Sequence, residues 1–340
     1  MIHFQCKMYS NERARTMKKT IIRFLSVLIL ISGFCTFVLP QEKIRIAVIP
    51  KSNTAVFWKS VHGGVKLGAA ALGGVEVVWK APLKDDDLVQ QISLVEQGIS
   101  EGVSGIALAP LNKEALAGSV AKAAKKKIPV LIFDSALKGT PGKDFISIVG
   151  IDNTKAGIIA GEQLAKLLGD RGKVVMLRVV SGQTNIENRE EGFLKAIAQF
   201  KGIRLIEKNL FVSGTAEETM NKCMKIADKL RDADGVFCSY EQSTMGMLFA
   251  LRNINLAGKV KFVGFDIPTP AVEALKKGEI SALVTQDPAR MGYYSIKTIV
   301  DYIRGKKVPS KIDIDVRVIT RENINDQDIQ KLIALPSMSD

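Results

Sequence analysis

The chain has 340 residues, of which 46% are hydrophobic, and this length favours two domains with cores of their own and excludes a disordered protein. The formal net charge of +13 is scattered along the sequence. No basic stripe with interleaved aromatic residues appears, so we expect no nucleic-acid partner.

The first 40 residues have the pattern of an export signal. Lys18, Lys19 and Arg23 precede an uncharged apolar run at 24–39, which is short for a membrane span. A retained membrane anchor is the alternative, because no clean small-residue cleavage site precedes Gln41. Both interpretations place the bulk of the protein in the periplasm or another extracytoplasmic space.

Four single residues carry further expectations. Met17 stands directly before the lysine pair, so residues 1–16 are expected to be an overextended start without a structural role. Cys35, in the stretch ISGFC, resembles the lipid acceptor of bacterial lipoproteins, although the preceding phenylalanine is bulky for that signal. Cys223 and Cys238 are expected to be buried thiols, with a disulfide between them as the alternative in an oxidising compartment.

From residue 44 onward, β-rich runs alternate with amphipathic helical runs, which is typical of parallel sheets covered by helices. Strands are expected at 44–50, 75–79, 105–110, 129–133, 145–149, 173–180, 203–207, 235–239, 259–265, 280–285 and 314–320. Helices are expected at 57–72, 86–101, 113–126, 154–168, 186–200, 216–231, 243–253, 270–277 and 289–304. The stretch 138–144 contains Gly and Pro without an apolar period, and it is the candidate boundary between two similar halves.

Many of these strands are followed by a polar or aromatic residue. Open parallel sheets bind ligands outside the carboxyl ends of their strands, so these side chains are expected to converge on one small-molecule site. The candidates are Asn53, Phe57, Trp58, Asp134, Asp152, Asn153, Arg189, Tyr240, Glu241, Asp266 and Gln286.

The residue types of this set suit a ligand rich in hydroxyl groups. A carboxylate such as Asp134 or Asp266 can bridge adjacent hydroxyls, and the planar guanidinium of Arg189 can donate to several oxygens together. Of Phe57 and Trp58, one is expected to face the core and the other to stack on a sugar ring. The alternatives are helix N-caps for the aspartates and a surface salt bridge of Arg189 with a neighbouring glutamate.

Signatures of catalysis are absent from the sequence. His62 is the only histidine beyond the leader, so histidine-based metal sites and Ser-His-Asp chemistry lack their parts. No phosphate-binding loop, GxSxG elbow or HExxH motif is present. We expect no enzyme, cofactor or metal, although Asp134 and Asp266 as a carboxylate pair leave a glycoside hydrolase open.

The order and spacing of six motifs are similar to those of a known family. IRIAVIPKSN followed by FW, GIALAP, IPVLIFDS, REEGF, KVKFVGFD and VTQDPARMGY together resemble the ribose/galactose-type periplasmic sugar-binding proteins of bacterial ABC importers, over about residues 43 to 320. The resemblance implies the type I periplasmic binding protein fold, an α/β fold of two similar lobes joined by a three-segment hinge. The expected N-terminal lobe is 41–150 plus 286–314, and the expected C-terminal lobe is 151–285 plus 315–340.

The resemblance also implies a role for particular residues. The ligand-binding positions of ribose-binding members correspond to Phe57, Trp58, Asp134, Arg189, Asp266 and Gln286. Departures put ribose itself in doubt: Ser135 and Ala109 replace a usual Arg and Asn, and Tyr240 with Glu241 replaces a common Asn-Asp pair.

Residues and resemblance together predict an extracytoplasmic solute-binding protein that captures a sugar or polyol between two lobes. It is expected to act as a monomer and to deliver its ligand to an ABC transporter permease. Delivery to a chemoreceptor or sensor kinase is the first alternative, and a secreted carbohydrate-active enzyme is the second.

Overall fold

The computed structural model describes residues 43–53, 55–84, 87–179, 183–212 and 215–334, which belong to one unit beginning at Lys43. The expectations for the leader, Met17 and Cys35 concern residues outside this part of the chain. Within these described ranges, no helix combines the length and the apolar character that crossing a bilayer requires.

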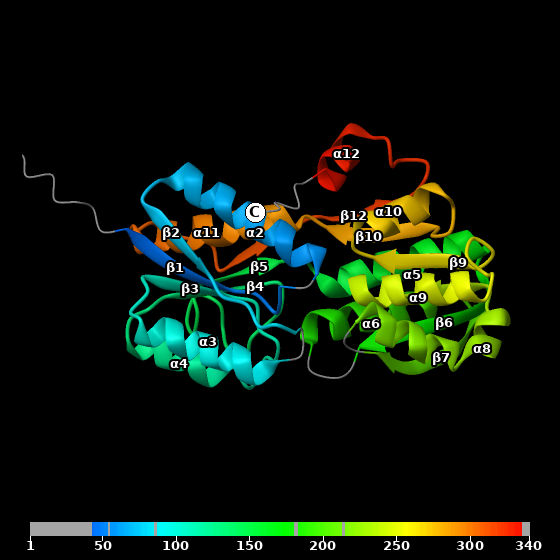
Figure 1. Ribbon diagram of the computed structural model, residues 1–340, viewed down its shortest axis with the longest axis horizontal. Helices are drawn as coiled ribbons and strands as arrows, with labels where there is room; N and C mark the ends of the chain where they lie inside the picture. The colour runs from blue at the N-terminus through cyan, green and yellow to red at the C-terminus, as the bar shows by residue number, and fades with distance from the viewer. Residues whose placement is uncertain (1–42, 54, 85–86, 180–182, 213–214, 335–340) are drawn as a thin grey trace, which may run out of the picture. The chain divides into compact units, whose positions relative to one another are not determined.

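The first sheet has six parallel strands in the order β11-β5-β4-β3-β1-β2 (Figure 1). Its strands are β1 Ile44–Ile49, β2 Val75–Trp79, β3 Gly105–Leu108, β4 Val130–Phe133, β5 Ser147–Gly150 and β11 Lys311–Asp313. It is covered by α2 Val56–Leu72, α3 Leu88–Ser100, α4 Ala117–Lys125 and α11 Pro288–Ile303. Residues 288–313, which form α11 and β11, therefore return to the first sheet.

The second sheet repeats this design in the order β12-β10-β9-β8-β6-β7, with only β12 antiparallel to its neighbour. Its strands are β6 Arg171–Val179, β7 Gly202–Val212, β8 Gly235–Phe237, β9 Lys261–Phe265, β10 Ala282–Gln286 and β12 Val316–Ile319. The helices of this half are α5 Asn153–Leu168, α6 Thr184–Ile197, α7 Ala216–Met224, α8 Ala227–Arg231, α9 Glu241–Asn253, α10 Thr269–Lys276 and α12 Gln327–Ile333. The two sheets confirm the expected fold class.

Side chains of β1 show how each sheet is covered on both faces. Ile46 and Val48 belong to the cluster that includes α2 and α11, whereas Ala47 and Ile49 belong to the cluster that includes α3 and α4. This alternation follows from the two-residue period of a strand. A strand buried on both faces has no polar side, which explains why its sequence is almost entirely apolar.

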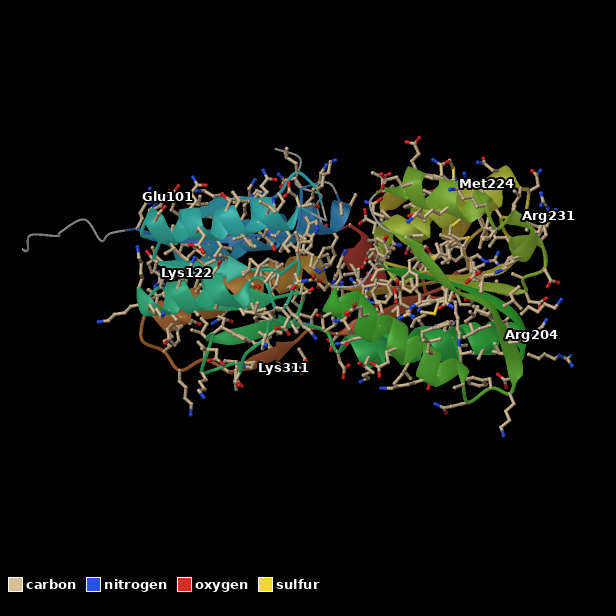
Figure 2. All side chains as sticks on the ribbon, turned by 90° about the horizontal axis from the view of Figure 1, so that it is seen from below. Glu101, Lys122, Arg204, Met224, Arg231 and Lys311 are labelled. Carbon is tan, nitrogen blue, oxygen red and sulfur yellow. The ribbon has the colours of Figure 1, made fainter. Side chains whose placement is uncertain are left out.

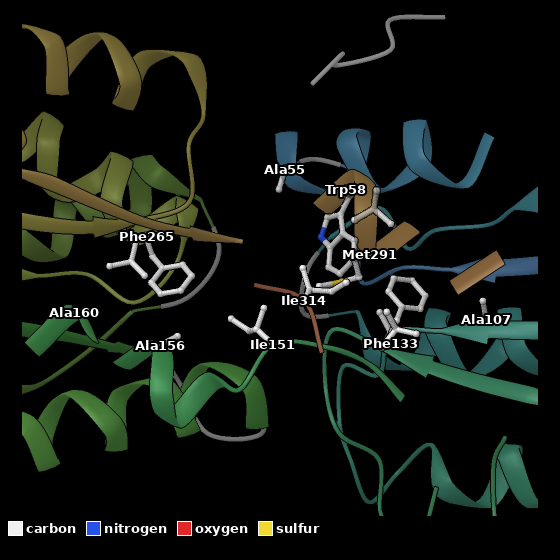
Figure 3. Close-up of a cluster of buried hydrophobic side chains, with 14 of the residues drawn as sticks. Ala55, Trp58, Ala107, Phe133, Ile151, Ala156, Ala160, Phe265, Met291 and Ile314 are labelled. Carbon is white, nitrogen blue, oxygen red and sulfur yellow. The ribbon is translucent and has the colours of Figure 1, made fainter. Parts of the chain in front are cut away.

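One apolar cluster joins the two halves. Figure 3 shows Trp58, Phe133 and Met291 on the side of the first sheet and Phe265 on the side of the second, with Ile151 and Ile314 between them. Ile151 and Ile314 belong to two of the connections by which the chain passes between the sheets, and the N–H of Ile314 donates to the carbonyl of Gly150 over 2.8 Å. The connections are thus part of the core.

Three elements differ from the sequence expectations. The strand expected at 314–320 is β12, which begins two residues later at Val316, and it is preceded by an unexpected strand of the other sheet, β11. The helix expected at 216–231 is interrupted after Met224. Helix α12 was not expected, because its only buried apolar residues are Ile329 and Leu332.

Candidate functional site

Two aspartates occupy equivalent positions in the two sheets. Asp134 follows β4 and Asp266 follows β9, and their backbones are left-handed, with φ of 62° and 64°. Each backbone N–H donates a hydrogen bond to the neighbouring strand. The N–H of Asp134 donates to the Val149 carbonyl over 2.9 Å, and that of Asp266 donates to the Val284 carbonyl over 2.8 Å. Such a conformation is uncommon for a residue other than glycine, and both side chains are buried at the carboxyl ends of their strands.

The Asp134 carboxylate is the centre of a buried polar triangle. Its Oδ2 atom lies 2.9 Å from Lys51 Nζ and accepts a hydrogen bond of 3.0 Å from Asn185 Nδ2. Lys51 Nζ in turn donates to Asn185 Oδ1 over 3.0 Å. Lys51 follows β1, whereas Asn185 lies on α6, so the triangle links the two halves.

Arg189 is the largest fully buried side chain of the second half. Its guanidinium donates to the Ser239 carbonyl over 2.5 Å and to Asn153 Oδ1 over 2.9 Å. Its Cζ atom lies 3.5 Å from the ring centroid of Phe265, which is a close cation–π contact. The guanidinium is fixed from three sides, while its Nε atom has no hydrogen-bond partner among the described residues.

Glu190, next to Arg189, has a structural role. Its carboxylate accepts hydrogen bonds from the Val179 N–H at 2.6 Å, from Arg178 Nε at 3.0 Å and from the Ser239 hydroxyl at 3.0 Å. Burial raises its pKa, and these hydrogen bonds lower it in part. Glu190 thereby fixes α6 against β6 and the segment after β8. Its carboxylate bonds to Arg178 and does not form the surface salt bridge with Arg189 that was the alternative expectation.

The Asp266 carboxylate has fewer hydrogen-bond partners to offset its burial than the Asp134 carboxylate has. Burial raises its pKa from 3.8 to about 6, against the lowering effect of the nearby Arg189 charge, and the Asp134 charge raises it further. Its Oδ1 atom and Oε1 of Gln286 have no hydrogen-bond partner among the described residues. The site therefore holds two buried acceptors and the Arg189 Nε donor that a ligand can satisfy.

The pKa of Asp266 predicts how the ligand-free protein responds to pH. Between about pH 4 and pH 6 the unfolded chain loses this proton while the folded protein keeps it, so this group lowers stability as the pH rises. Asp266→Asn removes the effect, and the variant should be more stable than the wild type by up to about 3 kcal/mol above pH 7. At pH 4 the two proteins should be nearly equal in urea unfolding, and an equal difference at both pH values would contradict the assignment.

The two aromatic residues after β1 separate as expected. Trp58 is 5% exposed and packs in the core with its ring centroid 6.3 Å from that of Phe133. Phe57 is half-buried, packs edge-on against Trp58 and lines a pocket beside Asp266. Phe57 is therefore the ring of the pair that a ligand can reach.

Glu241 crosses from the second half to the first. Its two carboxylate oxygens lie 3.3 Å from the backbone N–H groups of Val56 and Phe57, which begin α2. Free N–H groups and the helix dipole favour a carboxylate at this end of a helix. Glu241 thus joins the two halves at the edge of the pocket that it also lines.

Three other expected residues are not brought into the buried cluster. Asp152 is exposed and caps α5, where Oδ1 accepts from the Lys155 N–H over 2.9 Å, as in the helix-cap alternative. Asn53 is exposed, and its side-chain oxygen accepts from the Trp79 indole over 3.1 Å. Tyr240 precedes α9 and packs against the core of the second half.

Lys51 and Asn185 are site residues that the sequence reasoning missed. Lys51 stands two residues after β1, where the same strand-end rule could have found it. Asn185 lies at the start of the helix that carries Arg189, four residues earlier and therefore on the same helix face. Their burial, 3% and 6% exposed, is not visible in a sequence with many scattered lysines and asparagines.

The described residues contain no group of three or more His, Cys, Asp or Glu side chains placed to hold a metal ion. Cys223 and Cys238 are both buried and free, as in the first of the two expectations for them. Burial raises the pKa of Cys223 to about 12 and raises that of Cys238 as well. These thiols are therefore inert core residues.

Donors and acceptors from both halves meet in this cluster. Lys51 and Arg189 only donate, while the ionised carboxylates of Asp134 and Asp266 only accept. A hydroxyl does both, so a neutral polyol can bridge such groups. The fold and the cluster define a two-lobed solute-binding protein.

Comparisons with known proteins agree with this class. Residues 46–307 match the model of the periplasmic binding protein domain family. The ribose import binding protein of Haemophilus influenzae is 29% identical over 284 residues, covering 82% of this chain and 92% of that protein. The chain belongs to the periplasmic binding protein domain family.

Two solved structures extend the similarity. A carbohydrate transporter solute-binding protein from Agrobacterium radiobacter in complex with D-arabinose is 30% identical, with a TM-score of 0.81. An ABC transporter solute-binding protein from Agrobacterium vitis bound to α-D-tagatopyranose is 29% identical, with a TM-score of 0.80. Each comparison covers 86% of this chain and 99% of the other.

Proposed function

We propose that this protein is an extracytoplasmic solute-binding protein that captures a neutral sugar or sugar-like polyol and delivers it unchanged to an ABC transporter permease. The observation that carries the proposal is the pair of left-handed, buried aspartates, Asp134 and Asp266, at equivalent strand ends of the two sheets. Arg189 is buried with them, and both negative charges raise the pKa of its guanidinium against the lowering effect of burial. Relatives that bind sugars for ABC transport support the same function.

Ligand capture is proposed to couple to movement of two lobes, 41–150 plus 286–314 and 151–285 plus 315–340. Their connections would act as hinges near Gly150, Gln286 and Ile314. A ligand that bonds to Asp134 on one lobe and to Arg189 and Asp266 on the other interacts with both only when they are close together. Such differential binding is what favours a closed form.

The extracytoplasmic location and the monomeric state belong to the same proposal. The apolar run at 24–39 would direct the chain out of the cytoplasm, either as a cleaved signal or as an anchor, including a lipid on Cys35. A single monomer offers donors and acceptors on both sides of the cluster, so no second copy is needed to complete the site.

Isothermal titration with a panel of pentoses, hexoses, deoxysugars and polyols tests the function. At least one compound should bind with a micromolar Kd, since a few charge-assisted hydrogen bonds of about 1.5 to 3 kcal/mol each suffice. Asp266→Ala should keep the fold and weaken binding of that compound more than tenfold, because a buried acceptor is lost.

Asp152→Ala is the matched control for this substitution. Asp152 also follows a strand but is exposed and caps α5, so its removal should cost about 1 kcal/mol of stability and leave affinity unchanged. Equal loss of affinity in both variants, or no binding of any compound by the wild type, would refute the proposal.

A further inference from the structure

The ligand site and the start of the first strand lie at opposite ends of the first half. Asp134 follows β4 at the carboxyl end of the parallel sheet, so the amino ends of the strands form the other end. Figure 1 shows β1 beginning at this outer end. Three segments that meet there, 124–130, 142–146 and 302–308, are called the amino-end surface.

A pocket opens on the amino-end surface, and all three segments line it. Its lining includes four exposed lysines, Lys127, Lys143, Lys306 and Lys307. Phe145, which is buried, and Tyr302, whose exposed fraction is 46%, add carbon surface to the same lining. The amino-end surface thus combines positive charge with apolar contact area.

The acidic groups beside this pocket have partners within the protein. The Asp301 carboxylate lies 2.7 Å from Lys306 Nζ, so one of the four lysine charges is paired. Asp144 is the acidic residue of the lining, and its Oδ2 atom accepts a hydrogen bond of 2.7 Å from the Thr140 N–H. Neither carboxylate forms an ion pair with the other three lysines.

These three lysines have no acidic partner. Lys127, Lys143 and Lys307 form no ion pair with any residue that the structure describes. Lysines often lie at the carboxyl end of a helix, where they offset its dipole. Lys143 belongs to no helix, however, and Lys307 lies four residues beyond Ile303, the last residue of α11. Stabilisation of a helix end therefore does not explain why these two charges meet at one pocket.

The described chain begins at the same end of the sheet. Lys43 precedes β1, and β1 lies two strands from β4, whose amino end borders the pocket. Neighbouring strands are about 4.8 Å apart, so the starts of β1 and β4 are about 10 Å apart. The apolar run at 24–39 ends four residues before Lys43, and four residues span at most about 14 Å. An anchor retained in the leader would therefore keep the amino-end surface close to the bilayer.

We propose that the amino-end surface is a membrane-contact surface that binds the headgroups of anionic phospholipids. Lys127, Lys143 and Lys307 supply the charge that attracts the phosphates, and Tyr302 supplies an amphipathic ring of the kind enriched at membrane interfaces. A single lipid chain binds a membrane only marginally, and a basic patch is the second signal that makes such binding stable. The inference goes beyond the proposed function, because it concerns the end of the first half opposite to the ligand site.

Co-sedimentation of the exported protein with vesicles tests this contact. The probes are vesicles of phosphatidylcholine alone and of an equal mixture with phosphatidylglycerol. The mixture should bind at least about tenfold more strongly, since each lysine near an anionic membrane adds to the attraction. Most of the gain should disappear between about 0.1 M and about 1 M salt, where the Debye length falls from about 10 Å to about 3 Å. A leader that stays on the chain acts in both compositions, so the ratio between them reports the lysines.

Lys143→Glu combined with Lys307→Glu locates the effect. This double variant should lose at least about tenfold in binding to the mixed vesicles, because two attracting charges become repelling ones. Lys201→Glu combined with Lys208→Glu is the matched control, with the same change of charge on two exposed lysines of the second half. The control should keep the preference for the mixed vesicles within about twofold, and both variants should bind sugar like the wild type.

Three results would overturn the inference while leaving the proposed function intact. The first is equal binding of the wild type to both kinds of vesicle. The second is an equal loss in the two double variants, which would assign the attraction to the net charge of the chain. The third is displacement of the mixed vesicles by inorganic phosphate at constant ionic strength, which would assign the lysines to a soluble anion.

Discussion

Gly157→Ala is expected to destabilise the protein by about 3 kcal/mol and to weaken ligand binding. A Cβ atom at Gly157 would lie 1.8 Å from the carbonyl oxygen of Arg189, so α5 and α6 would have to move apart. Overpacking of this kind costs about 1 to 3 kcal/mol or more, which exceeds the helix propensity of about 1 kcal/mol gained with alanine. Because the clash is with the backbone of Arg189, its guanidinium would also shift, and both urea unfolding and titration should report the change.

Gly118→Ala is the control for this prediction. Gly118 lies on α4, is exposed, and a Cβ atom there meets nothing within 4 Å. Alanine should therefore leave stability unchanged or raise it by about 0.5 kcal/mol. Wild-type stability in Gly157→Ala would contradict the close helix contact that the structure shows.

The same contact recurs in both halves of the molecule. Gly192 on α6 would place a Cβ atom 2.0 Å from the Thr154 carbonyl, and in the first half Gly64 and Gly292 would meet the carbonyls of Ala289 and Val61 at 1.8 and 2.1 Å. Each pair joins a helix that follows a connection between the sheets, α5 or α11, to a helix beside the site. Because the glycines let the paired helices pack backbone against backbone, the positions of α6 and α2 depend on those of α5 and α11, which follow the connections.

The sequence predicted most strands and helices, because strands buried on both faces and amphipathic helices leave strong local patterns. Strand β11 was missed because the stretch KIDIDVRVIT, residues 311–320, has no breaking residue between β11 and β12. The break between β11 and β12 depends on a tertiary contact, the hydrogen bond from Ile314 to Gly150, and on antiparallel pairing of Val316 with Gln286. Such contacts lie beyond any local pattern.

Candidate site residues were predictable to the extent that strand ends define the site. Asp134 and Asp266 follow strands and adopt a left-handed backbone, whereas Asp152 also follows a strand but caps the next helix. The local sequences of these aspartates do not separate the two outcomes. The role of Lys51 depends on its pairing with Asp134, 83 positions away, which only the fold reveals.

Arg189→Met is expected to have the largest effect on binding, a loss of at least 100-fold, and to destabilise the ligand-free protein by about 3 to 5 kcal/mol. The guanidinium is 2% exposed, donates to Ser239 and Asn153 and stacks on Phe265. Its removal leaves two buried acceptors unsatisfied and takes away the charge that lowers the pKa of Asp266. That pKa should therefore rise, and the binding loss should be larger at pH 6 than at pH 8.

Arg204→Met separates this effect from a general loss of positive charge. Arg204 is an exposed arginine of β7 at the edge of the molecule (Figure 2), so its removal should change neither affinity nor stability by more than about 0.5 kcal/mol. Arg189→Lys keeps the charge but cannot reproduce the planar fork that reaches Ser239 and Asn153 together, so it should restore stability in part and affinity little. If lysine restored wild-type affinity, charge alone would be what the site requires, and the geometry of the guanidinium would have no part in binding.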